Sequence, residues 1–203
     1  MITLYHAPQS RSSRIVWLLE ELGGPYEIRP VSIFRPMTGA GAPDPVNPHP
    51  DKQVPAIEHD GVLVAESVAI VLYLTDAFPE AGLGPIVGDP LRGAYLTWLA
   101  WYSAGMEPAM FASMGGELAG APMKQRAYDA AVKRLEGALA KSLWLLGETF
   151  SGADLLVGSA INFARKAFPP SDLLDAYVAR CKARPAALRA LGLDEAQGVQ
   201  RAA

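Results

Sequence analysis

Residues 54–74 constrain the fold of this chain most, because they read as two strands and a helix joined by short turns. The strand patterns at 54–59 and 62–65 are rich in β-branched residues, and the Asp60-Gly61 dipeptide between them suits a two-residue hairpin turn. A helix is expected to begin near Ser67. Its N-terminus would present free backbone N–H groups and the positive end of the helix dipole, beside the acid Glu66 and the hydroxyl of Ser67. We therefore expect this corner to hold a small zwitterion.

The residues before this stretch predict a strand, a helix and a second strand. Residues 2–5 read as a short strand, and the apolar residues between 15 and 22 recur at i, i+3, i+4 and i+7, which is the spacing of one helix face. Gly23 and Pro25 end that helix, and residues 26–31 alternate like a second strand. A strand, a helix and a strand within about 30 residues predict two parallel strands.

Proline and glycine divide the chain at two places. Residues 34–51 contain five prolines, which exclude an ordinary helix, so we expect a long loop whose role is left open. Residues 78–88 are the best linker candidate, and only helical patterns follow them. We predict a small mixed sheet covered by helices in residues 1–78, a linker at 79–88 and an all-helical domain at 89–203.

Three features of the predicted helical domain concern folding. Asp89 before a proline is a good helix start. Ser151 and Asp154 have the spacing of a capping box at the start of a later helix, so we assign Asp154 to folding and not to catalysis. The last helix carries Cys181 on its apolar face, where an inert core thiol is expected. The tail after residue 193 is expected to fray.

Composition excludes several functions. With 18 Lys plus Arg against 21 Asp plus Glu, the formal charge of −3 offers nothing to a phosphate backbone, so no nucleic-acid partner is expected. The longest apolar run, 68–74, is far short of the roughly 20 residues that span a bilayer, and the first residues lack a signal-peptide pattern. One cysteine permits no internal disulfide or C-x-x-C site, and His6 and His59 have no carboxylate at metal-ligand spacing. We expect a cytoplasmic protein without a metal or membrane contact.

Three short motifs stand at informative positions. Gln-Val-Pro-Ala-Ile occupies 53–57, Glu-Ser-Val-Ala-Ile occupies 66–70, and Phe-Ser-Gly-Ala-Asp occupies 150–154. With the order of elements, they resemble the cytosolic glutathione S-transferase family, in particular bacterial-type members with a serine-type active site. The resemblance covers nearly the whole chain. It implies an α/β thioredoxin-like N-terminal domain, an all-α C-terminal domain, a homodimer and a role in detoxification.

The resemblance also implies a reaction, the attack of the glutathione thiolate on a small hydrophobic electrophile. Free thiols have a pKa of about 8.5 and are mostly protonated at neutral pH, so the enzyme must favour the thiolate. A hydroxyl that donates a hydrogen bond to the sulfur does so, and a helix N-terminus adds to the effect. The loop after the first strand offers Ser10, Ser12 and Ser13. Counted back from Arg14, Ser10 matches the catalytic serine of the family.

Other residues near this loop remain alternatives. Tyr5 lies where tyrosine-type classes place their activating phenol, although its strand pattern favours a core role. Arg11 could stabilise the thiolate by its charge or could be a solvated loop residue. Ser12 is a candidate glutathione contact, and either Ser12 or Ser13 could instead cap the helix.

Four further residues are assigned to glutathione by the resemblance. A proline within a strand removes a ladder donor, so Val54-Pro55 needs a reason. In the family this proline is cis, and the backbone of the preceding residue pairs with the cysteinyl part of glutathione. Ser67 and its amide would take the γ-glutamyl carboxylate, and Glu66 would contact the ammonium group. Simple helix capping is the alternative for Glu66 and Ser67.

The glycyl end of glutathione has three candidate partners, which are Lys52, Gln53 and His49. The chain reads Asp-Lys-Gln-Val-Pro at 51–55, where the family commonly has Gly-Lys-Val-Pro, so the choice among the three stays open. Tyr102 and Met106 could line the electrophile pocket between the domains, although an apolar stripe at helical spacing also fits a plain core.

Other functions fit the same scaffold. They are a glutathione-dependent isomerase, peroxidase or disulfide-bond reductase, and a non-catalytic glutathione-binding or interaction protein. An isomerase of the zeta type carries Ser-Ser-Cys-Ser in the first loop, whereas residues 9–13 here contain no cysteine. We therefore favour glutathione transfer.

Overall fold

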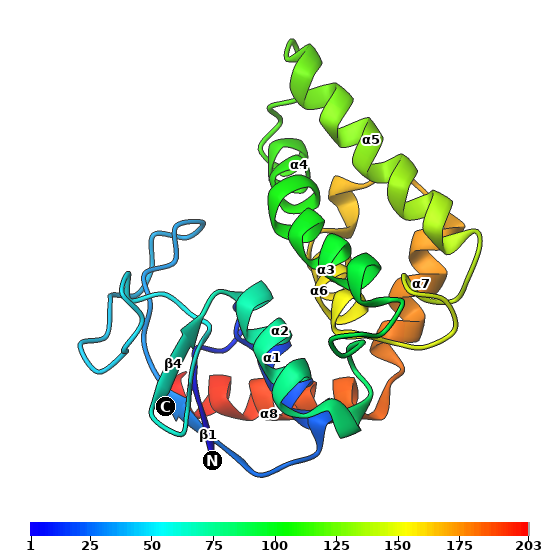
Figure 1. Ribbon diagram of the computed structural model, residues 1–203. Helices are drawn as coiled ribbons and strands as arrows, with labels where there is room; N and C mark the ends of the chain where they lie inside the picture. Colours follow the sequence, from blue (N-terminus) through cyan, green and yellow to red (C-terminus); the bar gives the residue numbers. More distant parts are fainter. Residues whose placement is uncertain (203) are drawn as a thin grey trace. The chain divides into compact units, whose positions relative to one another are not determined.

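The computed structural model describes residues 1–202, and the side chains of residues 1–198. It consists of two compact units, drawn in Figure 1. Unit 1 comprises Met1–Ala81 together with the chain from Arg184 onward, and unit 2 comprises Gly82–Ala183. The boundary between the units lies within residues 79–88, and the residues from Arg184 onward, which the sequence places with the helical domain, group with unit 1. None of the helices among the described residues is long and apolar enough to cross a membrane.

Unit 1 contains a four-stranded sheet with the order β2-β1-β3-β4. The strands are β1 (Ile2–His6), β2 (Tyr26–Pro30), β3 (Ala56–His59) and β4 (Val62–Ala65). Strand β1 runs parallel to β2 and antiparallel to β3, and β3 and β4 form the predicted hairpin. A type I′ turn requires positive φ at both of its central residues. Asp60 and Gly61 meet this requirement, with φ angles of 50° and 82°. The predicted parallel pair and hairpin are confirmed.

Two helices of unit 1 were predicted from their sequence pattern. Helix α1 (Ser13–Leu22) buries Ile15, Leu18 and Leu19 on the predicted face, and the Gly23 amide closes it by donating to the Leu19 carbonyl. Gly23 has φ 71°, a conformation that glycine adopts at low cost. Helix α2 (Ser67–Ala77) begins at the predicted residue.

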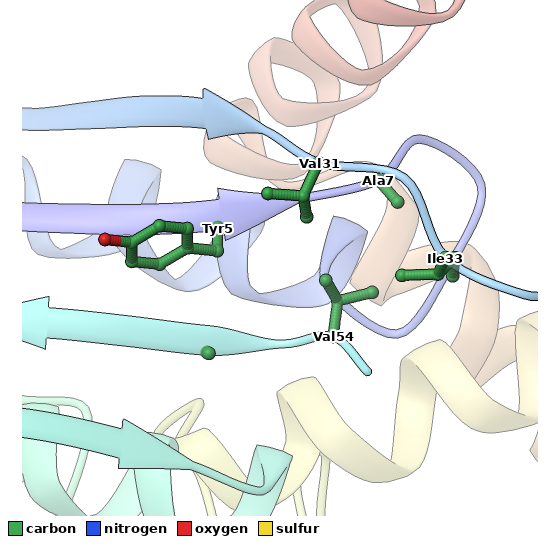
Figure 2. Close-up of a cluster of buried hydrophobic side chains, with 6 residues drawn as sticks. Tyr5, Ala7, Val31, Ile33 and Val54 are labelled. Atoms are coloured by element: carbon green, nitrogen blue, oxygen red, sulfur yellow. The ribbon is translucent and has the colours of Figure 1, made fainter. Parts of the chain in front are cut away.

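A small apolar cluster lies on one side of the sheet of unit 1, at the end where β1 and β2 finish and β3 begins. Figure 2 shows Tyr5, Ala7, Val31, Ile33 and Val54 meeting there, and all five are buried. Because side chains alternate along a strand, Tyr5 points to this side, whereas His6 points to the other. The cluster packs together the segments that follow β1 and β2 and the segment that precedes β3.

Helix α8 (Pro185–Ala202) was not expected in unit 1. It runs alongside α1 (Figure 1), and its buried face consists of Ala186, Ala190 and Asp194, at four-residue spacing. Two arginines bind α1: Arg184 makes bonds of 2.6 and 2.8 Å to Glu21, and Arg189 lies 2.6 Å from Glu20. The expectation of a frayed tail after residue 193 is therefore wrong for the described backbone, which stays helical to Ala202.

All regular elements that the structure describes in unit 2 are helical. These are α3 (Arg92–Trp101), a π-helical turn (Tyr102–Met106), α4 (Glu107–Met114), α5 (Pro122–Leu139), α6 (Gly152–Phe163) and α7 (Asp172–Lys182), with one short 3₁₀ turn (Arg165–Ala167). The predicted capping box starts α6, where Asp154 accepts bonds from the Ser151 amide and hydroxyl. Cys181 is a buried thiol on α7, as expected, and a side chain at Gly158 of α6 would collide with its sulfur.

Candidate functional site

Three segments of unit 1 meet at one end of its sheet. Tyr5 of β1 lies opposite Ala56 of β3, and Ala56 lies opposite Ala65 of β4. Because β3 runs antiparallel to both neighbours, its beginning lies beside the ends of β1 and β4. The loop of residues 7–12, the segment just before β3, and residues 66–67 therefore lie at the same end. The topology brings together the serine loop, the Val-Pro dipeptide and the N-terminus of α2.

The serines of the loop have different surroundings. Ser10 is partly exposed, and its Oγ donates to the Ala7 carbonyl at 2.6 Å and lies 2.8 Å from Ser12 Oγ. Ser12 is fully buried, and its Oγ accepts from the Ala7 amide at 3.1 Å and lies 2.8 Å from His6 Nδ1. A ligand can therefore reach Ser10 without repacking, whereas Ser12 is a buried part of the loop itself.

The turn of the loop is clamped from two directions. Gln9 has φ 54°, which costs a non-glycine residue about 1–3 kcal/mol and persists only where its surroundings hold it. Its amide donates to Asp194 of α8 at 3.0 Å. Arg35, from the proline-rich segment, donates to the carbonyls of Pro8 at 2.6 Å and Gln9 at 3.0 Å. The long loop at 34–51, which had no assigned role, thus supplies Arg35 as one of two clamps, meaning side chains that hold the turn of the serine loop in place.

Asp194, His6 and Arg35 are site residues that the sequence analysis missed. Asp194 lay in a tail expected to fray, and His6 was considered only as a metal ligand. Only the histidine carried a usable signal, because it closes a strand and precedes a polar loop. In the described part of the chain, no group of three or more His, Cys, Asp or Glu side chains could hold a metal ion.

Tyr5 has the core role that its pattern favoured. Its side chain is buried in the cluster of Figure 2. Its hydroxyl donates to Glu58 at 3.2 Å and accepts from Arg29 at 3.3 Å, across the neighbouring strands. Arg11 lies exposed on the serine loop. The phenol is thus occupied within the sheet, which leaves Ser10 as the better thiol partner of the two.

The Val54-Pro55 peptide bond is cis, as the resemblance implied. Strand β3 begins only at Ala56, so the proline stands outside the ladder that it would have interrupted. The side chain of Val54 packs into the apolar cluster. This burial anchors the segment that enters β3 at the candidate site.

Residues 66 and 67 have two unusual features. Glu66 is exposed and has φ 69°, a conformation that non-glycine residues adopt mainly where function or packing demands it. Ser67 is buried, and its Oγ has no hydrogen-bond partner among the described residues. Buried polar groups in native proteins are rarely left unpaired. The unpaired hydroxyl at the N-terminus of α2 is suited to an incoming acceptor, and the helix dipole favours a negative one.

The three candidates for the glycyl end have different tasks in the structure. His49 is buried, and its Nδ1 accepts from the Asp51 amide at 3.0 Å. The Lys52 ammonium donates to the Asn47 carbonyl at 2.7 Å, which leaves it further donors. The side chain of Gln53 is exposed. Of the three, Gln53 and Lys52 can still meet a ligand, whereas His49 serves the loop.

Tyr102 and Met106 are buried in the core of unit 2, with exposed fractions of 2% and 0%. The Tyr102 hydroxyl donates to Glu107 at 2.7 Å. Both side chains are enclosed by the core of the unit, and the Tyr102 hydroxyl already has an acceptor. The structure therefore agrees with the plain core alternative for this apolar stripe.

Comparison with known proteins gives consistent matches along the chain. Residues 1–76 match the glutathione S-transferase N-terminal domain, and residues 100–183 match the glutathione S-transferase C-terminal domain. The chain is 31% identical over 176 residues to glutathione S-transferase 3 of Schizosaccharomyces pombe, a match that covers 85% of this chain and 70% of that protein.

Solved structures with the same fold are also found. A glutathione S-transferase from Actinobacillus pleuropneumoniae superposes with a TM-score of 0.82 at 25% identity, over 96% of this chain and 93% of the other. A sphingomonad glutathione S-transferase, solved in complex with glutathione, has a TM-score of 0.78 at 24% identity, over 95% and 98% of the two chains.

Proposed function

Since this chain belongs to the glutathione S-transferase family, with a thioredoxin-like N-terminal domain and a helical C-terminal domain, we propose that it conjugates the glutathione thiolate to small apolar electrophiles and that Ser10 stabilises the thiolate. The observation that carries the proposal is the meeting of three segments at one end of the sheet. These are the loop of Ser10, the cis Val54-Pro55 dipeptide and the unpaired hydroxyl of Ser67.

Ser10 has the geometry to change its hydrogen-bond acceptor. The Ser10 oxygen accepts a hydrogen bond from the Ser12 amide at 3.1 Å. The oxygen can therefore stay in place while the hydroxyl proton turns from the Ala7 carbonyl to the sulfur. A hydrogen bond to a charged acceptor is roughly twice as strong as a neutral one. The thiolate therefore competes well with the carbonyl, and the exchange lowers the pKa of the bound thiol.

The remaining contacts divide glutathione into three parts. Ser67 and the first amides of α2 take the γ-glutamyl carboxylate, and Glu66 takes the ammonium group. The backbone of Val54 pairs with the cysteinyl part. Lys52 or Gln53 meets the glycyl carboxylate. We further propose that the active form is a cytoplasmic homodimer.

The test uses retention on immobilised glutathione and the rate of conjugation to a chloronitroaromatic electrophile. Ser10→Ala should be retained like the wild type and should conjugate roughly 10- to 100-fold more slowly, because a hydrogen bond to a charged group contributes about 1.5–3 kcal/mol. Glu66→Ala should lose retention. Glu195→Gln, an exposed change on α8, is the control. If the wild type is not retained, the glutathione assignment fails, and if Ser10→Ala conjugates at the wild-type rate, the catalytic assignment fails.

A further inference from the structure

We propose that Asp194, on the C-terminal helix, is a positioning residue that holds Ser10 in place through His6 and Ser12. The inference rests on the proposed function, because it concerns the serine that would meet the thiolate. Its basis is a continuous set of contacts in unit 1, from a carboxylate near the end of the chain to the hydroxyl of Ser10.

Asp194 makes three contacts with one short segment. Its Oδ1 accepts from the Ser13 hydroxyl at 2.5 Å and lies 3.3 Å from His6 Nε2, and its Oδ2 accepts from the Gln9 amide at 3.0 Å. These residues are more than 180 positions away in the sequence. Burial raises the pKa of the Asp194 carboxyl, but the contact with His6 and the hydrogen bonds from Ser13 and Gln9 outweigh it and lower the pKa overall. The carboxylate is thus charged and engaged on both oxygens.

His6 carries the contact to the serines. The ring is fully buried, with Nε2 towards Asp194 and Nδ1 2.8 Å from Ser12 Oγ. The Nε2 contact falls short of an aligned hydrogen bond, yet Nε2 has no other polar partner among the described residues. A carboxylate only accepts, so this placement favours the tautomer with the proton on Nε2 and leaves Nδ1 facing the serine.

Ser12 completes the connection to Ser10 with two contacts. Its amide donates to Ser10 Oγ at 3.1 Å, and its own Oγ lies 2.8 Å from Ser10 Oγ. Ser12 therefore fixes the Ser10 oxygen while leaving the Ser10 proton able to turn. The ring that fixes Ser12 is itself fixed by Asp194, and the same carboxylate holds Gln9 in its left-handed conformation.

The order of Ser12, His6 and Asp194 is also that of a hydrolase triad, but the geometry does not fit a nucleophile. Ser12 has no exposed surface, and its Oγ already meets the Ala7 amide, the imidazole and Ser10. An electrophile cannot approach that oxygen. The set of contacts therefore acts by positioning Ser10.

The experiment compares Asp194→Asn, Ser12→Ala and the double variant with the wild type. Asp194→Asn keeps the shape of the side chain, and Glu195→Gln makes the same charge change at the next, exposed position of α8. The readouts are kcat, KM for glutathione, and the pKa of the bound thiol from the ultraviolet absorbance of the thiolate. Circular dichroism shows whether each variant is folded.

Asp194→Asn should lower kcat by roughly 10-fold and raise the pKa of the bound thiol by about one unit, with a smaller change in KM for glutathione. Ser12→Ala should have the same effect, and the double variant should be no worse than either, because residues that act through one another do not add. Glu195→Gln should match the wild type.

An unchanged thiol pKa in a folded Asp194→Asn variant would overturn the inference, as would additive losses in the double variant. If Asp194→Asn does not fold, Ser12→Ala decides alone, since an unchanged thiol pKa there contradicts the same connection. A wild type that neither binds nor conjugates glutathione defeats the proposed function, and this inference with it. A wild type that is active beside an equally active Asp194→Asn defeats the inference alone.

Discussion

Two buried aspartates, one in each unit, show how the same side chain serves folding in one place and the candidate site in another. Asp154 accepts from the Ser151 and Leu145 amides and from Tyr177, all within unit 2. Asp194 accepts from Gln9 of the serine loop and Ser13 of α1 and contacts His6 of β1, all in unit 1. Asp154 caps the start of α6, whereas Asp194 links α8 to residues near the start of the chain.

The largest expected effect concerns Asp154. Replacing it by alanine removes the acceptor of two buried amides and of the Ser151 hydroxyl, at about 1–3 kcal/mol for each unsatisfied group, while the Tyr177 hydroxyl keeps the carbonyl of residue 154. We expect Asp154→Ala to lower the free energy of unfolding by about 3–5 kcal/mol, measured by urea denaturation. Asp194→Asn should lose clearly less stability than Asp154→Ala. Equal losses would mean that Asp194 is also mainly a folding residue.

The difference between the aspartates also explains what could be predicted from the sequence. The capping box was found because Ser151 and Asp154 are three residues apart, and the hairpin and α2 were found because their patterns are local. Helix α8 was missed because its buried face is Ala186, Ala190 and Asp194, which gives almost no hydrophobic period.

The candidate site was likewise predictable only where its signal is local in the sequence. The resemblance indicated Ser10, Pro55 and Ser67, and in the structure these are a partly exposed serine, a proline after a cis peptide bond and the first residue of α2. The burial of Ser12 and His49 could not be predicted, because it depends on partners brought in by the fold. Long-range clamps such as Arg35 leave no periodic signal at all.

The next effect concerns the second clamp of the serine loop. Arg35→Ala removes both donors to the carbonyls of Pro8 and Gln9. These carbonyls can turn to water, so the loss is about 1 kcal/mol, and kcat should fall roughly five-fold. Arg35→Lys should restore part of the rate, since an ammonium can still donate to one carbonyl. A rate unchanged in Arg35→Ala would show that Asp194 alone holds the loop.

The smallest effect is on the pH dependence of stability, where the two aspartates should act in opposite directions. Burial raises the pKa of Asp154 despite its hydrogen bonds, so the folded state binds the proton more tightly and this group loses stability as pH rises above its unfolded pKa. The lowered pKa of Asp194 contributes stability that is present above the unfolded value near 3.8 and is lost as pH falls through the folded value.

Urea denaturation between acid and neutral pH checks this prediction. With the wild type as reference, Asp194→Asn should destabilise more at neutral pH than in acid. Asp154→Asn should destabilise more in acid than at neutral pH. The same slope for both variants would contradict the distinction between the two carboxyl groups.

The role of Ser10 is tested most directly by the pKa of the glutathione thiol bound to the wild type and to Ser10→Ala, followed by the ultraviolet absorbance of the thiolate. If Ser10 stabilises the thiolate, the wild-type value lies below the free-thiol value of about 8.5 and rises by about one to two units in Ser10→Ala. The same thiol pKa in both proteins would contradict this role.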